Sequence, residues 1–129
     1  MAKHNTIAVF GEAIQTTDAT VTSIATFTTA PSKGYLVRAS VVALNVTDLT
    51  QGAGYQRLAA FRTSAAGVLT QIGATSTTPS PIEDNAAWDV TIDASGTDIR
   101  VRATGAAATL INWRADVVIN QVGNGPEYS

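Results

Sequence analysis

The stretch that most constrains the fold is 87–122, in which apolar and polar residues alternate. The alternation runs through three successive segments, and Gly96 and Gly105 lie in the short breaks between them. A period of two places neighbouring side chains on opposite faces of a β-strand. The pattern therefore predicts a meander of three antiparallel strands with one buried face. The side chains expected in the structural core are Trp88, Val90, Ile92, Ile99, Val101, Ile111, Trp113, Val117 and Ile119.

The rest of the chain is also rich in threonine and other β-branched residues, which favour strands. Apolar residues do not recur with a period of 3.6, so no helix is expected. About eight short strands separated by turns predict an all-β fold, an antiparallel β-sandwich or jelly roll. The further strands are expected at 6–10, 13–17, 21–28, 35–47, 55–63 and 68–72, and a long surface loop at 73–85.

A length of 129 residues favours one domain with a substantial core. We expect a single β-sandwich domain over residues 1–129, with a short polar N-terminal arm at 1–5 and a flexible C-terminal tail at 123–129. The tail contains Gly125 and Pro126, which do not favour continuation of a strand.

Composition disfavours several classes of function. The chain has no cysteine, which excludes disulfides, thiolate catalysis and cysteine-based metal sites. The formal net charge is −2 and no basic stretch is present, so we expect no nucleic-acid partner. No run of about 18 apolar residues occurs, and the apolar run at 7–10 is too short for a secretory signal. We therefore expect no membrane partner. The absence of cysteine suits synthesis in a reducing cytoplasm.

Residues suited to catalysis are sparse. His4 is the single histidine and lies in the polar arm, so a Ser-His-Asp arrangement cannot be assembled. Glu83 and Asp84 supply at most one half of the carboxylate pair that glycoside hydrolysis requires. We therefore expect that the protein is not an enzyme and has no catalytic residue.

The candidates for metal or sugar binding also have simpler structural explanations. Asp89, Asp93 and Asp98 carry oxygen ligands of the kind that Ca²⁺ prefers. Asp89 and Asp93, however, alternate with buried residues, which places them on a solvated face. Trp88 and Trp113 share faces with aliphatic neighbours, which favours the core over a sugar-stacking platform. We expect no metal and no cofactor.

The segment 35–47 is the longest predicted strand, and it is apolar on both faces. One row, from Val37 to Ala43, is enough to serve the domain's own core. The second row belongs either to a second core layer or to a surface that another subunit covers, and the pattern leaves both possibilities open. The candidate subunit interface consists of Leu36, Val42, Leu44 and Val46.

Three arginines and three aspartates lie on the polar face of the predicted meander. Ion pairs between neighbouring strands account for these charges without a ligand. The six side chains are Arg100, Arg102, Arg114, Asp89, Asp93 and Asp116.

Six short segments carry a likeness to a known group of proteins. They are Thr16-Thr17-Asp18-Ala19-Thr20 leading to Ile24, Ala39-x-Val41-Val42-Ala43, Ala60-Phe61-Arg62, Leu69-Thr70-Gln71-Ile72-Gly73, Trp88-Asp89-Val90-Thr91 and Asn112-Trp113-Arg114-Ala115. Over about residues 15–122, the chain resembles a small β-sandwich domain of tailed-bacteriophage virion proteins.

The resemblance implies a non-enzymatic structural protein of the virion, made in the cytoplasm of a bacterial host. Such domains occur in tail or fibre components and in capsid accessory proteins. No long fibrous stalk is present in this sequence, which favours a capsid decoration (cement) protein. Such a protein is expected to form a homotrimer, bind the major capsid protein or other virion proteins, and stabilise the assembled head. The alternative is a tail or fibre module that binds a host-surface receptor or glycan. A small glycan-active enzyme is disfavoured by the scarcity of histidine and of paired carboxylates.

Overall fold

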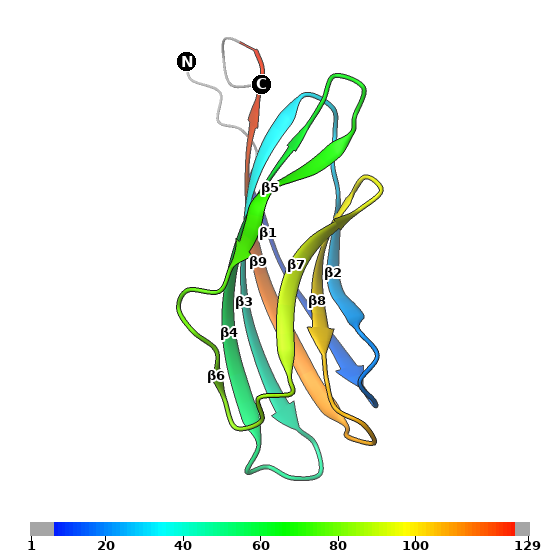
Figure 1. The fold of residues 1–129 in the computed structure, drawn as a ribbon, viewed down its shortest axis with the longest axis vertical. Helices are drawn as coiled ribbons and strands as arrows, with labels where there is room; N and C mark the ends of the chain where they lie inside the picture. Colours follow the sequence, from blue (N-terminus) through cyan, green and yellow to red (C-terminus); the bar gives the residue numbers. More distant parts are fainter. Residues whose placement is uncertain (1–6, 126–129) are drawn as a thin grey trace.

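The computed structural model describes residues 7–125, and in this range the chain forms an all-β sandwich (Figure 1). Nine strands form two antiparallel sheets, so the predicted fold class is confirmed. None of the described residues belongs to a helix of the length and apolarity that a membrane span needs. The strands are β1 (Ile7–Thr16), β2 (Thr22–Thr28), β3 (Lys33–Asn45), β4 (Gly52–Thr63), β5 (Leu69–Ser76), β6 (Ile82–Glu83), β7 (Asp89–Ser95), β8 (Asp98–Thr104) and β9 (Ile111–Gly123).

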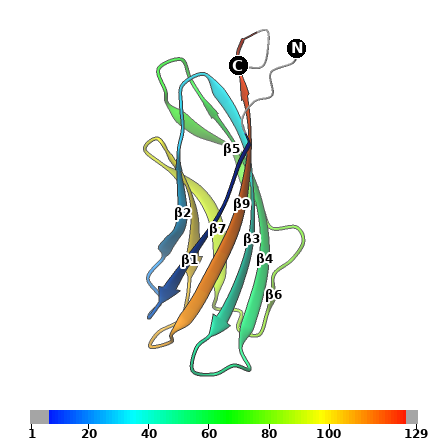
Figure 2. The ribbon, with the colours of Figure 1, turned by 180° about the vertical axis from the view of Figure 1, so that it is seen from behind.

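The two sheets differ in size. The larger sheet has the strand order β1-β9-β3-β4-β5, with β6 paired to one end of β4, and the smaller sheet has the order β2-β8-β7. Figure 1 shows the smaller sheet as a layer beside the larger one, and Figure 2 shows both layers from behind. Each sheet therefore turns one face towards the other sheet and one face outward.

The predicted three-strand meander is wrong in its last strand. β7 and β8 pair along their length, as expected. β9 instead crosses to the larger sheet, where it lies between β1 and β3. Alternation fits either sheet, because each sheet buries only its inner face. On the crossing segment, a Cβ at Gly105 would lie 2.8 Å from the Thr16 hydroxyl oxygen, so the close approach to β1 requires glycine there.

The core lies between the two sheets. The nine side chains expected in it are each at most 2% exposed. The Trp113 ring centroid is 6.0 Å from that of Trp88 and 6.4 Å from that of Tyr55. Trp113 Nε1 donates a hydrogen bond to Thr16 Oγ1 at 2.9 Å. The two tryptophans thus belong to an internal aromatic cluster, and neither forms a surface platform for sugars.

Several boundaries differ from those expected. β1 continues through Gly11, where the sequence suggested that a strand stops. β5 extends to Ser76, and β6 pairs with β4, so only part of 73–85 is a loop. Of the predicted flexible tail, Gly123 is the last residue of β9. The predicted arm at 1–5, with His4 in it, and residues 126–129 lie outside the described residues.

The turn after β3 is built around a buried side chain. Asn45 is 5% exposed. Its Oδ1 accepts hydrogen bonds from the backbone N–H groups of Thr47 and Asp48, both at 3.0 Å. These bonds bend the chain away from the sheet, so Val46 lies just beyond the strand that was predicted to contain it.

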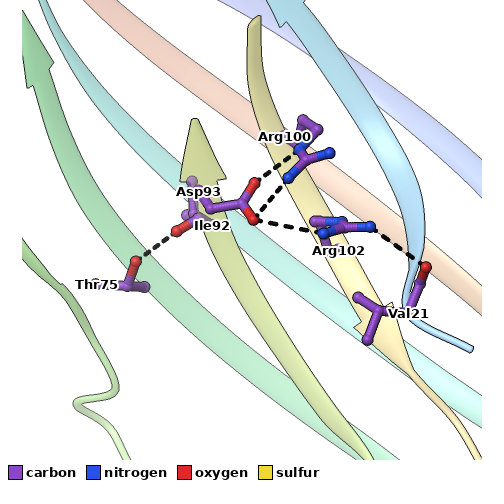
Figure 3. Close-up of polar contacts among 6 residues, drawn as sticks. All are labelled: Val21, Thr75, Ile92, Asp93, Arg100 and Arg102. Carbon is purple, nitrogen blue, oxygen red and sulfur yellow. Dashed lines mark hydrogen bonds and ion pairs between the residues drawn. The ribbon is translucent and has the colours of Figure 1, made fainter. Parts of the chain in front are cut away.

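Two side chains of the larger sheet bind the free edge of β7. Arg57 on β4 is 3% exposed, and its Nε donates to the Val90 carbonyl at 2.6 Å. Thr75 on β5 donates through Oγ1 to the Ile92 carbonyl, also at 2.6 Å (Figure 3). An unpaired edge strand otherwise exposes such carbonyls to other chains. The two bonds therefore close this side of the sandwich.

Candidate functional site

The outer face of the smaller sheet is polar, and its charges bind one another (Figure 3). The Asp93 carboxylate accepts hydrogen bonds from Arg100 Nε at 2.8 Å and Nη2 at 3.0 Å, and it lies 3.6 Å from Arg102 Nη1. The hydrogen bond to Asp93 raises the pKa of Arg100. Arg102 also donates to the Val21 carbonyl at 3.4 Å. Each of these three charged side chains thus has a partner within the chain.

The three aspartates considered as a calcium site have separate partners. Asp89 Oδ1 lies 3.3 Å from Arg57 Nη2, and Asp98 Oδ1 accepts a hydrogen bond from the Thr28 hydroxyl at 2.8 Å. Asp93 is bound by the two arginines described above. Among the described residues, no group of three or more acidic, histidine or cysteine side chains is arranged to hold a metal ion.

The two carboxylates considered for acid–base chemistry fasten β6 to β4. Glu83 Oε2 accepts a hydrogen bond from the Tyr55 hydroxyl at 2.6 Å, and Asp84 Oδ2 accepts one from the Gly52 backbone N–H at 2.9 Å. Burial, and secondly the bond to Glu83, raises the pKa of Tyr55 well above its ordinary value. These contacts give both carboxylates a structural role.

The outer face of the larger sheet has a different character. The described residues include twelve exposed large apolar side chains, and eight of them lie on this face. We call this surface the apolar sheet face. Its eight residues are Val9, Leu36, Val42, Leu44, Leu58, Ile72, Ile82 and Val122.

The predicted subunit interface falls partly on this surface. Leu36, Val42 and Leu44 are 36%, 58% and 44% exposed on the apolar sheet face, and Val46 is 40% exposed beyond the end of β3. No described part of the chain covers these side chains, so residues 7–125 contain no second core layer over this row. Sequence reasoning missed the neighbours that β1, β4, β5, β6 and β9 contribute. Leu58 was visible as the outward residue of an alternating strand, but its place opposite Arg38 on β3 depends on strand pairing.

One ion pair lies within the apolar sheet face. Arg114 Nη2 is 3.2 Å from Asp116 Oδ1 on the same strand, and the two side chains are 60% and 64% exposed. The predicted pairing of Arg114 across a meander is therefore wrong, because β9 belongs to the larger sheet. A Cβ at Gly11 would lie 2.6 Å from Arg114 Nη2 and 2.9 Å from Asp116 Oδ1. The pair thus lies directly over Gly11, and any larger residue there would displace it.

Three hollows mark the apolar sheet face. One of about 310 Å³ is bounded by Gln56, Ile82 and Arg114, below the loop that joins β5 to β6. A second, of about 630 Å³, lies beside it around Leu44. A third, of about 340 Å³, lies at the other end of the face beside Leu36. The surface is therefore uneven and combines aliphatic side chains with a few polar groups.

Comparisons with known proteins reveal a shared fold but no family. No protein-family model and no curated protein matches this chain. Among solved structures, the tailspike protein of Acinetobacter baumannii phage AM24 matches with a TM-score of 0.54 at 9% identity, over 95% of this chain and 27% of that chain. The tailspike protein gp49 of Acinetobacter baumannii bacteriophage Fri1, a capsular polysaccharide depolymerase, matches with a TM-score of 0.40 at 13% identity, over 95% of this chain and 19% of that chain.

The chain is thus similar to a part of each tailspike. It spans 27% of the length of the AM24 protein, and at 9% identity the likeness shows the fold. That fold is a β-sandwich that occurs within phage virion proteins. The β-sandwich fold that the resemblance implied is therefore confirmed, whereas the narrower prediction of a capsid decoration protein is not.

The prediction that the protein is not an enzyme is corrected by these comparisons. One of the two tailspikes is described as a capsular polysaccharide depolymerase. We therefore withdraw the non-enzymatic assignment. No reaction and no catalytic residue is transferred from that tailspike to the present chain.

Proposed function

We propose that this chain is a module of a phage tail component, of the tailspike or tail-fibre kind, and that it associates with other copies through the apolar sheet face. The fold likeness to the AM24 tailspike supports a tail component. This likeness favours a place on the tail over a place on the assembled head. The expected attachment to a major capsid protein stays a prediction. Cryo-electron microscopy of the phage particle tests this directly, since density for the chain on the head shell would contradict the tail assignment.

The observation that carries the proposed association is the concentration of exposed apolar side chains on one surface. Eight of the twelve exposed large apolar residues lie on the apolar sheet face, and the outer face of the smaller sheet is polar. Contiguous apolar patches on a protein surface mark interaction sites. A protein partner that covers this face removes the aliphatic side chains from water.

The size of the face suits a stable interface. Five strands about 4.8 Å apart and about ten residues long, at about 3.3 Å per residue, give an area of about 800 Å². That is about the area that each partner buries in a specific protein interface of standard size. An identical subunit offers an apolar sheet face of the same area.

We expect three copies in the assembly. A closed ring of identical subunits buries the same surface in every copy. In a ring of three, each sheet face turns towards the axis and divides its area of about 800 Å² between the two neighbours. The low net charge of −2 offers little repulsion to oppose this association.

Sedimentation velocity of the purified chain tests the association. We expect an oligomer at micromolar concentration, and we expect Leu44→Asp or Val42→Asp to shift it to monomer, because a carboxylate would then be buried among aliphatic side chains. The matched control is Thr26→Asp, which places the same charge on the exposed outer face of the smaller sheet. This control is expected to associate like the unmodified chain.

Two results would contradict the proposed association. One is a monomer at every accessible concentration. The other is a Leu44→Asp variant that loses its β-type circular dichroism, because that residue would then be required for the fold of the single chain. A Thr26→Asp variant that also dissociates would show that added charge, and not its position, weakens the assembly.

A second candidate function is binding of a host-surface glycan, and the hollow bounded by Gln56 favours it. Ser40, Gln56, Arg114 and Asp116 contribute polar groups to its lining, and such groups hydrogen-bond to sugar hydroxyls. A glycan array with the purified chain tests this candidate. Selective binding that Gln56→Ala weakens and Thr26→Ala leaves unchanged would support it, and an array without selective binding would exclude it.

A further inference from the structure

We propose that Arg114 and Asp116 exchange partners between copies, so that Arg114 of one copy binds Asp116 of the next within the interface. This inference rests on the proposed association through the apolar sheet face. It goes beyond that association by naming the polar contact that selects a second copy as the occupant of the face.

The position of the pair is the first observation. Val42 on β3 is the register partner of Arg114 on β9. Val9 on β1 lies two residues before Gly11, which is the register partner of Asp116. Leu44 lies two residues beyond Val42 on β3, opposite Asn112. Any protein that covers these aliphatic side chains also removes water from the arginine and the aspartate between them.

The unmet bonding of the pair is the second observation. Within the described residues, the pair is joined by one contact, from Arg114 Nη2 to Asp116 Oδ1. Neither side chain forms another hydrogen bond with residues 7–125, so one carboxylate oxygen and most of the guanidinium face water in this part of the structure. Buried ion pairs are tolerated only when further polar groups replace that water. An occupant of the face must therefore offer an acceptor to Arg114 and a donor to Asp116.

A second copy of this chain meets both requirements at once. It carries a guanidinium and a carboxylate at the same separation, on a surface with the same distribution of aliphatic residues. A partner with one sign of charge would satisfy one member of the pair and repel the other. Charge complementarity therefore favours another copy over an acidic or a basic partner.

Gly11 makes room for the pair. A Cβ there would lie within 2.6 Å of Arg114 Nη2 and 2.9 Å of Asp116 Oδ1, so the two side chains lie flat across the backbone of β1. The absence of a side chain at Gly11 leaves the space that the pair occupies. Gly11 is therefore a positioning residue of the interface, although it offers no side chain of its own.

Mixing two charge-reversal variants tests the exchange. Arg114→Asp gives a copy with two acidic side chains at this point, and Asp116→Arg gives a copy with two basic ones. We expect each variant alone to associate at least about tenfold more weakly than the unmodified chain, because like charges then meet across the interface. We expect an equimolar mixture to form heteromers, because a mixed ring of three has two contacts between an acidic and a basic copy and one between like copies, whereas a ring of one variant has three contacts between like copies.

The mixture separates exchange between copies from an effect within one chain. A pair that acts only within its own strand is broken in both variants, and mixing cannot repair it. Sedimentation velocity of the mixture, with one variant carrying a fluorescent label, measures the heteromer. Thr26→Arg mixed with Thr26→Asp is the matched control and should show no preference for heteromers.

Single variants that associate like the unmodified chain, or a mixture without heteromers, would overturn the exchange. If Leu44→Asp dissociates the assembly in the same experiment, the proposed association still holds and only the exchange is wrong. If the unmodified chain is a monomer, both fail together. Should either reversal unfold the chain, Gly11→Ala replaces it: displacing the pair is expected to weaken association, and unchanged association would overturn the inference.

Discussion

The two outer faces of this sandwich are made by the same alternation of inward and outward residues, yet they differ in chemistry. On the smaller sheet, hydroxyl-bearing side chains surround charges that bind one another, with Asp93 held by two arginines. On the larger sheet, aliphatic side chains surround a single ion pair whose members are at least 60% exposed. The inner faces of both sheets are mainly apolar, and Arg57 is one of the few buried polar side chains. The inward residues of both sheets specify the fold. The outward residues of each sheet are therefore free to serve a separate purpose.

The largest expected effect comes from an inward residue. Trp113→Ala should reduce the free energy of unfolding by about 3–5 kcal/mol, because it empties a fully buried site. Asn112→Ala, one residue away on the outer face, should change it by less than about 0.5 kcal/mol. Urea titration measures both. Comparable losses at the two positions would break the proposed division between inward and outward residues.

A smaller effect is expected on the polar face. Asp93→Ala leaves Arg100 and Arg102, both about a quarter exposed, without their shared carboxylate. We expect a loss of about 1 kcal/mol, reduced in high salt because the group is partly screened by solvent. Urea titration at low and high salt checks this, and a loss that does not depend on salt would argue against an electrostatic cause.

A still smaller effect is expected from the ion pair on the apolar face. Asp116→Ala should change the free energy of unfolding of the isolated chain by less than about 0.5 kcal/mol, because exposed ion pairs contribute little. The free energy of unfolding should be measured by urea titration at a concentration where the chain is monomeric. A loss as large as that of Asp93→Ala would show that both faces stabilise the fold equally, and the contrast between them would not hold.

The smallest effect concerns acid sensitivity in a loop that belongs to neither face. The side-chain and backbone hydrogen bonds from Thr50 lower the pKa of Asp48 below its ordinary 3.8. A carboxyl with a lowered pKa contributes stability above its unfolded-state pKa, and that contribution is lost as the pH falls through the folded-state pKa. Asp48→Ala should therefore be slightly less stable than the unmodified chain at neutral pH. Below pH 3.8 the difference should shrink, and urea titration across this range checks it.

Much of the fold follows from the sequence because alternation reports the orientation of each residue. It identified the strand positions and the inward side chains, including both tryptophans. It did not report which strands are neighbours. β9 shows the limit most clearly, since a row such as Ile111, Trp113 and Ala115 satisfies either sheet. The segment that carries β9 to the larger sheet packs closely against β1 at Gly105, a contact that alternation does not encode.

The candidate surface was predictable only in part, for the same reason. Leu36, Val42 and Leu44 share one strand, so their common face is evident from their spacing. Ile72 and Val122 join them only because β5 and β9 lie in the same sheet as β3. The contact of Gly11 with the ion pair depends on the pairing of the first strand with the last, which no local pattern encodes.

The place of β9 in the larger sheet also governs the order in which the chain can fold. Figure 2 shows this last strand between β1 and β3, and β1 pairs with no other strand. During synthesis β1 must therefore wait for its partner until β9 has been made. Folds that depend on such distant pairings form slowly, and strand edges that stay unpaired can pair wrongly with neighbouring chains. We therefore expect completion of β9 to be the event that commits each newly made chain to its native sheet.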